Sequence, residues 1–418
     1  MIAGRAIQGA GSGGINMIVD IIVSDLVPLR ERGNFIAIIL AVYSVGTSLG
    51  PFLGGIIVEK TTWRWVFLIT LPFGGLSIIL LFLFLHVKSK RLTVTEGLKR
   101  IDIIGNAIII SSSVSILFAL TYAGSPYSWS SWHILVPLIL GFCGYSAFII
   151  FEGSKFCPDP VIPLRLFNNR TSVVVYVNTF INSMLLYWVM FFLPVYFQVA
   201  LGSSPARSGV QLLPIILVAV PGAVIAVIVL SKFGKYKLLH LVGFAIATLG
   251  TGLFILLDQH SSTAKWVVFQ VVAGLGSGMV LNTLLPAFQA SHPERDQAAA
   301  TASWAFIRSF GNIWGVAIPA AIFNNRINGI LYRITDEGTR QAIAGGQAYE
   351  LGPSVLKATS SPQLRDQISG VYADALKVVW AVAAGFGALS FILVFIEREI
   401  TLRKELETDY SLKEKTAS

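Results

Sequence analysis

Charged residues are scarce in this sequence. Only 13% of its 418 residues are Asp, Glu, Lys or Arg, while 54% are hydrophobic. An ordinary globular domain carries roughly a quarter charged residues, so a water-soluble protein is excluded and most of the chain must lie in lipid. Cysteine is also scarce: Cys143 lies in an apolar run and Cys157 in a polar connection, so no disulfide framework follows.

Signatures of metal sites and nucleotide phosphate loops are absent from the sequence. The five histidines match neither HExxH nor a Cys/His zinc spacing, and no GxxxxGK[ST] run occurs. We therefore expect no metal, no cofactor and no ATP-driven pumping by this chain. No combination of nucleophile, base and metal suggests an enzyme.

Apolar runs of about twenty residues are abundant, and each is long enough to cross a hydrocarbon core of about 30 Å as a helix. They predict an all-α, polytopic membrane protein. The first run has a glycine-rich middle and lacks the compact apolar core of a signal peptide, so we interpret it as a span. The eleven predicted spans cover roughly 3–23, 36–58, 66–86, 102–121, 134–152, 173–196, 208–230, 238–257, 264–286, 299–322 and 371–396.

The net charge of +9 is distributed in short basic connections that alternate with nearly uncharged ones. If the C-terminal tail is cytoplasmic, the connections on that side hold 19 Lys and Arg residues, and the short connections opposite hold only Lys60, Arg64, Arg207 and Lys265. The positive-inside rule favours this orientation. The same alternation argues against a nucleic-acid partner, which would favour one basic patch.

Glycine is concentrated inside several predicted spans, most clearly in GTSLGPFLGG at 46–55. Gly46, Gly50 and Gly54 fall four residues apart and share one face of a helix, and small residues let helix backbones approach closely in lipid. Pro51 removes a backbone hydrogen bond and bends the helix. We expect this face to pack against another helix, either as a static seam or as a pivot. The run GLGSG at 274–278 predicts a second close approach.

Two motifs resemble those of a known family. The run GRAIQGAG at 4–11 is similar to the R-x-x-Q-G-x-G signature on the fourth span of major facilitator superfamily transporters. The run at 46–55 is similar to the fifth-span motif of the superfamily's antiporters, with Gly46, Gly50, Pro51, Gly54 and Gly55 at the motif positions. Essentially the whole chain resembles the fourteen-span drug:proton antiporter branch, abundant in fungi, through residues 24–33, 62–72, 192–214, 306–318 and the tail near 397–410.

The resemblance implies a major facilitator fold and a secondary active transporter. The activity implied is proton-coupled efflux of small organic compounds, such as drugs, toxins or secondary metabolites, by alternating access across the plasma membrane or the vacuolar membrane. Two alternatives stay open. One is a proton symporter or siderophore-type carrier, and the other is a non-transporting membrane protein, either truncated or regulatory.

The resemblance also implies a domain layout. With 3–23 as the fourth span, three spans would precede it, and we expect the 418-residue chain to transport only when joined to them. The layout would be a partial N-terminal bundle (1–86), two linking spans (87–171), a C-terminal six-helix bundle (172–396) with an extracellular loop (323–370) carrying one or two surface helices, and a cytoplasmic tail (397–418).

Proton coupling is assigned by resemblance to Arg5, whose charge would shift the pKa of a nearby carboxylate. Asp20 has two interpretations: a solvated position near the lipid headgroups, or a protonatable group that faces the transport cavity. Gln8, Gly9 and Gly11 are expected to pack against a neighbouring helix.

Five residues are candidates for lining a substrate cavity: Asn182, Tyr187, Trp188, Arg308 and Asn312. A charge at the bilayer centre costs about 2.5–3.5 kcal/mol, so Arg308 should face the bundle interior or an aqueous path. A structural hydrogen bond between helices, involving Arg308 and Asn312, is an equally open interpretation. The aromatic residues around Tyr187 and Trp188 either anchor the membrane interface or form an apolar cavity wall.

Overall fold

The protein is helical in the parts of the chain that the structure describes. The computed structural model describes residues 2–26, 29–84, 102–124, 126–157, 160–293 and 296–400, and these contain helices but no β-strand. Nine helical segments within these ranges are long and apolar enough to cross a membrane.

The helices follow one another with short connections. In chain order they are α1 (Ile2–Leu26), α2 (Leu29–Lys60), α3 (Trp65–Leu68), α4 (Thr70–Phe84), α6 (Ile103–Tyr122), α7 (Trp132–Glu152), η1 (Leu164–Phe167), α8 (Arg170–Val195), η2 (Tyr196–Ala200), α9 (Pro205–Gln211), α10 (Leu213–Phe233), α11 (Lys237–Leu253), η3 (Phe254–Leu256), α12 (Thr263–Leu281), α13 (Leu284–Ala290), α14 (Gln297–Ile330), η5 (Leu331–Arg333), α15 (Glu337–Ile343), α16 (Ala348–Ala358) and α17 (Pro362–Val394).

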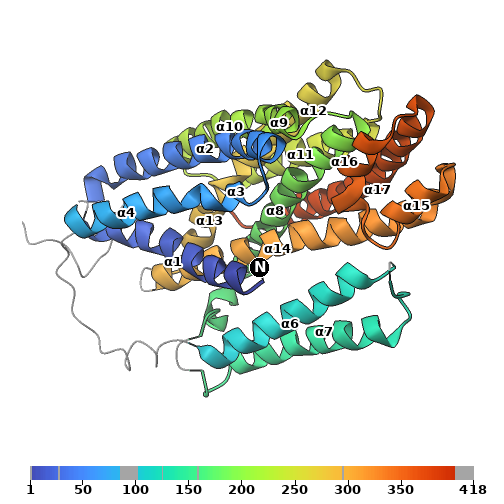
Figure 1. Ribbon diagram of the computed structural model, residues 1–418. Helices are drawn as coiled ribbons and strands as arrows, with labels where there is room; N and C mark the ends of the chain where they lie inside the picture. The colour runs from blue at the N-terminus through green and yellow to red at the C-terminus, as the bar shows by residue number, and fades with distance from the viewer. Residues whose placement is uncertain are drawn as a thin grey trace, which may run out of the picture.

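Each of the eleven predicted runs coincides with a helix. Nine correspond to the candidate spans, and the runs 3–23 and 36–58 fall on α1 and α2. The expected surface helices between the last two spans are also confirmed, because α15 and α16 occupy that connection. Figure 1 shows them gathered at one end of the molecule beside the start of α17.

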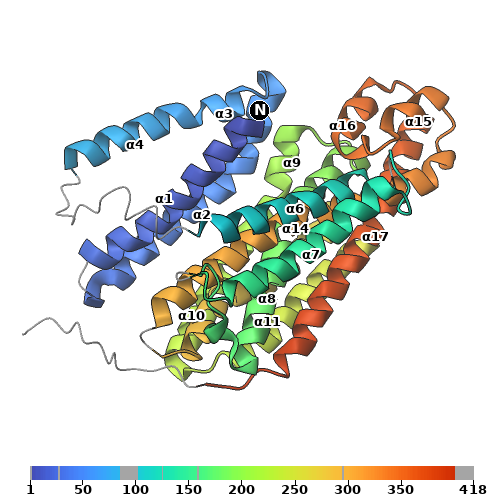
Figure 2. The same ribbon diagram turned by 90° about the horizontal axis from the view of Figure 1, so that it is seen from below.

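Six long helices pack around a common interior. α8 contacts α14 and α17, while α12 contacts α10 and α11, and α11 contacts α17. α6 and α7 form an antiparallel hairpin that lies along α14 (Figure 2). α1, α2 and α4 lie together at another side, where α2 contacts α9 and α10 (Figure 1).

Glycines bring α12 into backbone contact with both of its neighbours. A Cβ atom added at Gly274 would lie 2.5 Å from the carbonyl oxygen of Ile215 in α10, and one added at Gly276 would lie 2.2 Å from the amide nitrogen of Ala247 in α11. The close approach expected for the GLGSG run is confirmed, with α12 held between two helices.

The tip of the α6–α7 hairpin is tied to α14 by side-chain amides. Trp129 Nε1 donates to Asn325 Oδ1 at 3.0 Å, and Asn328 Nδ2 donates to the carbonyl oxygen of Gly124 at 2.8 Å. Gly124 has φ +72°, a conformation that favours glycine, and an added Cβ there would collide with Asn325. This contact fixes the position of the hairpin along α14.

A buried polar cluster ties the chain after α17 to α8 and α11. The side chains of His240 and Glu397 are fully buried, with His240 Nδ1 2.9 Å from Glu397 Oε2, and Asn178 Nδ2 donates to Glu397 Oε1 at 3.3 Å. Tyr236 OH donates to the carbonyl oxygen of Arg398 at 2.7 Å. Burial raises the pKa of the Tyr236 phenol, so its hydroxyl stays protonated and available as a donor. We call His240, Glu397 and Asn178 the tail clamp.

The tail clamp makes a prediction about stability. Glu397→Ala leaves the ring of His240 and the amide of Asn178 buried without an acceptor, and losing one partner of a buried pair costs about 3–5 kcal/mol. We expect a clear fall in the thermal unfolding temperature of the purified protein. Glu399→Ala is the matched control, because Glu399 is exposed and accepts one hydrogen bond, from Tyr236 N. Equal unfolding temperatures for the two variants would contradict a stabilising role for the clamp.

Candidate functional site

Two glycines hold α8 and α14 in backbone contact. An added Cβ at Gly311 would lie 2.6 Å from the carbonyl oxygen of Phe180, and one at Gly315 would lie 2.2 Å from that of Met184. These glycines are four residues apart and therefore share one face of α14. We call this line of contact the α8–α14 seam.

Polar side chains gather beside the α8–α14 seam. Arg308 and Asn312 on α14 are partly buried, and Tyr187 on α8 is 38% exposed, whereas Asn182 is buried on the other face of α8. Tyr187 lies within electrostatic reach of Arg308 and also of Tyr43 on α2. All five predicted cavity residues thus lie on one helix pair, and Tyr187, Arg308 and Asn312 lie beside the seam, close to a helix from the other end of the chain.

Arg308 has an aromatic neighbour. Its guanidinium carbon lies 5.4 Å from the ring centroid of Trp304, and Trp304 Nε1 donates to Thr179 Oγ1 at 3.1 Å. A cation over a tryptophan face is attractive without an acidic partner. The alternative, a structural hydrogen bond from Arg308 or Asn312 to another helix, does not occur among the described side chains, and neither does an ion pair to Arg308. The guanidinium therefore keeps donors that a ligand can use.

Trp188 requires a correction. Its side chain is 0% exposed, and its ring lies 6.2 Å from that of Phe386 on α17. It belongs to the packed interior and lines no cavity. The aromatic stretch divides by helix face, because Phe192 is buried with Trp188 whereas Tyr187 and Phe191 are exposed and stack on each other.

The second region of interest is the contact between α2 and α9. A Cβ added at Gly55 would lie 2.4 Å from the carbonyl oxygen of Pro205, and one added at Gly209 would lie 2.4 Å from that of Pro51. The backbone N–H of Ala206 donates to Glu59 Oε2 at 3.3 Å. The two helices thus meet backbone to backbone, and a carboxylate of α2 binds the first turn of α9.

The predicted glycine stripe lies on another face of α2, and its packing stays a prediction. Nothing described lies within 4 Å of a Cβ built at Gly46, Gly50 or Gly54. The packed face of α2 instead carries Pro51 and Gly55. Each step along a helix turns it by about 100°, so Gly55 points well away from Gly54. The motif does make a close helix contact, but through the adjacent face.

Arg5 and Gln8 lie on an exposed part of α1. Arg5 Nη1 donates to Gln8 Oε1 at 3.1 Å, and its guanidinium lies 4.4 Å from the ring centroid of Phe67. No carboxylate pairs with Arg5 among the side chains that the structure describes. A Cβ added at Gly9 or Gly11 meets nothing described within 4 Å, so the expected packing of these glycines stays a prediction.

The side chain of Asp20 lies outside the described residues, although α1 includes its position.

A groove of about 580 Å³ lies between the tip of the α6–α7 hairpin, α14 and α17. It contains none of the predicted cavity residues. Its walls are apolar except for an amide and a guanidinium, and they are formed by Leu120, Trp129, Ile322, Asn325, Arg326 and Val378, among others.

Sequence reasoning missed Glu59 and the tail clamp. Glu59 precedes a short connection by two residues and resembles any interfacial carboxylate. A lone histidine in an apolar helix, such as His240, was a usable signal, because a buried imidazole requires a polar partner. Its partner Glu397 is 157 residues away, so the pair could not be found from local spacing.

Comparisons with known proteins identify a family of membrane transporters. A family model described as Major Facilitator Superfamily matches residues 1–316. The MFS-type transporter TwmF of Talaromyces wortmannii is 49% identical over 420 residues, which is 100% of this chain and 76% of that protein. The MFS-type efflux transporter ffsH of Aspergillus flavipes is 46% identical over 422 residues, which is 99% of this chain and 74% of that protein.

One solved structure is similar in fold. It is a crystal structure of a bacterial homologue of the human lysosomal transporter Spinster, in an inward-facing and occupied conformation. The TM-score is 0.50 at 16% identity, with 90% of this chain and 71% of that chain covered. At this identity the likeness concerns the fold alone.

The α2–α9 contact generates a prediction for cross-linking. Overpacking a close contact costs about 1–3 kcal/mol, so Gly55→Leu should slow cross-linking between Glu59→Cys and Ala206→Cys by about tenfold. The background carries Cys143→Ser and Cys157→Ser, and the reagent is a short thiol-specific cross-linker.

Gly50→Leu is the matched control for this experiment, because it adds the same volume on the same helix where no described atom is close. If Gly50→Leu slowed the reaction and Gly55→Leu did not, the packed face would be the predicted stripe after all.

Proposed function

The chain belongs to the major facilitator superfamily, and on that premise we propose that it is a proton-coupled exporter of small organic compounds. It is a multi-pass integral membrane protein with helices of the family's fold. The Aspergillus flavipes relative is named as an efflux transporter, which supports export as the direction. Drugs, toxins and secondary metabolites are the proposed substrate class.

The observation that carries this proposal is the α8–α14 seam. It presents the guanidinium of Arg308, the amide of Asn312 and the phenol of Tyr187 beside apolar and aromatic side chains, and Tyr43 of α2 lies within electrostatic reach. A pocket with mostly apolar walls and a few polar groups suits amphipathic organic compounds. In the proposed site Arg308 and Asn312 orient the substrate, and Tyr187 forms part of the wall.

Alternating access would use the α2–α9 contact. Transporters of this kind move two bundles against each other around a central site. The contact through Gly55 and Gly209 involves backbone on both sides, so it has a defined closed state and no long side chains that must reorder when it opens. We propose that it closes one side of the pathway and that Pro51 allows α2 to bend as it opens.

Proton coupling is assigned to α1 in this proposal. Arg5 has an exposed guanidinium that donates to Gln8, so it can favour the ionised form of a carboxylate brought near it during the cycle. Asp20 on the same helix is the proposed proton acceptor. No ATP and no cofactor take part.

We propose that the protein lies in the plasma membrane with its C-terminal tail on the cytoplasmic side. The positive-inside distribution of Lys and Arg supports the orientation. The proposed division is a partial first bundle (1–86), a linking hairpin region (87–171), a second bundle (172–396) and a tail (397–418).

Two variants separate coupling from substrate binding in a vesicle assay. Coupling free energies of about 1–3 kcal/mol correspond to about 5–150-fold, so Arg5→Ala should lower uphill transport driven by a pH gradient about tenfold or more while sparing downhill exchange. Arg308→Ala should lower both modes, because it removes donors from the proposed site.

The assay uses amphipathic dyes and fungal metabolites as substrates. The chain is tested as given and fused behind the first three spans of a family relative. Accumulation that follows the proton gradient, rather than opposing it, would identify a symporter. Absence of gradient-driven flux from both forms would contradict the proposed function.

A further inference from the structure

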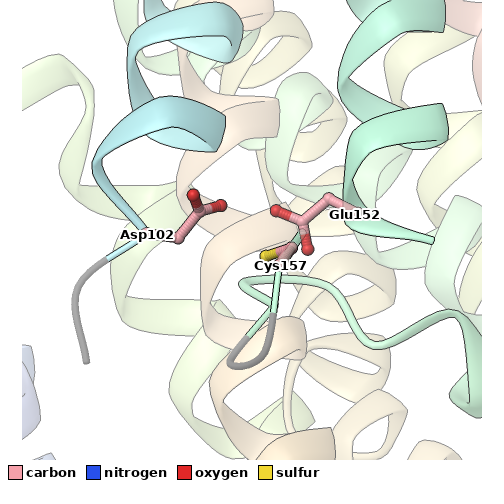
Figure 3. Close-up of side chains that lie close together, drawn as sticks. All are labelled: Asp102, Glu152 and Cys157. Carbon is pink, nitrogen blue, oxygen red and sulfur yellow. The ribbon is translucent and has the colours of Figure 1, made fainter. Parts of the chain in front are cut away.

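A cluster of three ligand-type side chains lies where the α6–α7 hairpin begins and ends. Asp102 is the N-cap of α6, Glu152 is the last residue of α7, and Cys157 follows after a turn. One oxygen of each carboxylate and the sulfur of Cys157 all lie within 4.8 Å of one another. Figure 3 shows the two carboxylates facing each other with the sulfur beside Glu152.

One oxygen of each carboxylate accepts a backbone hydrogen bond, and the other oxygen faces the cluster. Gly105 N donates to Asp102 Oδ1 at 2.8 Å, and Ile162 N donates to Glu152 Oε2 at 3.0 Å. Asp102 Oδ2 and Glu152 Oε1 are buried and have no hydrogen-bond donor. Glu152 is only 4% exposed. Backbone amides thus fix both acids, as outer contacts fix ligands at metal sites.

The arrangement is unfavourable while both acids are ionised. Two carboxylates that face each other repel, and burial removes the water that would screen them. No Lys, Arg or His forms an ion pair with either carboxylate among the described residues. A cation bound by both orphan oxygens would satisfy both groups at once.

We propose that Asp102, Glu152 and Cys157 bind a divalent cation of the zinc type. A thiolate favours zinc over the hard cations magnesium and calcium, and carboxylate oxygens also ligate zinc. Zinc bonds of about 2.0–2.3 Å in tetrahedral geometry place ligand atoms about 3.4–3.6 Å apart, so the cluster needs only small side-chain rotations. Water completes the fourth position, and the thiol proton leaves to solvent on binding.

The bound ion would fasten the hairpin to the second bundle. The segment that holds Glu152 through Ile162 N also accepts a hydrogen bond from α14, where Ser303 Oγ donates to the carbonyl oxygen of Val161 at 3.3 Å. In the proposed orientation this end of the hairpin faces the cytoplasm, where cysteine thiols stay reduced and can ligate zinc. The site would therefore fix the hairpin at the end opposite its Asn325 contact.

Metal titration of the purified, chelator-treated full chain tests the proposal. Cobalt(II) serves as the spectroscopic probe, and zinc is then added in competition. We expect one cobalt ion per chain, with the ligand-field bands of a tetrahedral site and a thiolate-to-cobalt charge-transfer band, all displaced by zinc. Mutating a residue that only holds a metal ligand in place lowers metal affinity by about 10–100-fold. Removing a ligand itself, as in Cys157→Ser, should therefore lower cobalt affinity by more than about 100-fold.

The variants are chosen to keep the fold. Glu152→Gln retains an oxygen for Ile162 N and loses the second ligand oxygen, so it should bind cobalt weakly. Cys143→Ser is the matched control, because Cys143 lies on α7 outside the cluster and its loss should change nothing. Zinc should raise the unfolding temperature of the parent protein and of Cys143→Ser, but not that of Cys157→Ser or Glu152→Gln.

Three results would overturn the proposal. They are absence of cobalt binding by the parent, a charge-transfer band that survives Cys157→Ser, and stabilisation by zinc that is equal in Glu152→Gln. Absence of binding together with stabilisation at low pH would mean that the two acids share a proton instead.

Discussion

Backbone contact between helices is the constraint on which the rest of this structure depends. In lipid, helices gain little by burying apolar side chains against each other, so close van der Waals packing must hold them together. The contacts at Gly311 on α14, at Gly276 on α12 and at Gly55 on α2 leave no room for a Cβ atom. They set the distances between helices, and those distances place Tyr187 near Arg308 and α2 against α9.

Polar groups are arranged around these contacts in two different ways. His240 and Glu397 pair with each other, and Asn178 donates to the other oxygen of Glu397, which stabilises the end of the chain against α8 and α11. His240 Nε2 and Asn178 Oδ1 are buried there without a partner. Asp102 and Glu152 are instead fixed by backbone amides with an oxygen of each left over. Buried polar groups are costly when unpaired. In the tail clamp both oxygens of Glu397 have protein partners, whereas at the hairpin two carboxylate oxygens face each other without one, which favours a bound cation there.

Hydropathy was sufficient to predict the helices, because a span must satisfy its backbone internally and its length is set by the bilayer. It was harder to predict which face of each helix packs against a neighbour. Spacing predicts packing at Gly46, Gly50 and Gly54, which stays a prediction. It did not predict that α9 contacts Pro51 and Gly55, because no property of α2 alone specifies its partner. Trp188 was placed in a cavity because a run of aromatics does not show which residues face the interior. The cluster at Glu152 joins residues about fifty positions apart, beyond any local motif.

The proposed transport cycle requires α2 to move relative to α9. Spin labels at Val58 and Arg207, both exposed and on facing helices, report this distance by pulsed electron resonance in lipid nanodiscs. We expect one short distance in the resting protein and a second, longer population when substrate is added and the pH is lowered. A single unchanged distance in protein that transports the same substrate in vesicles would contradict it.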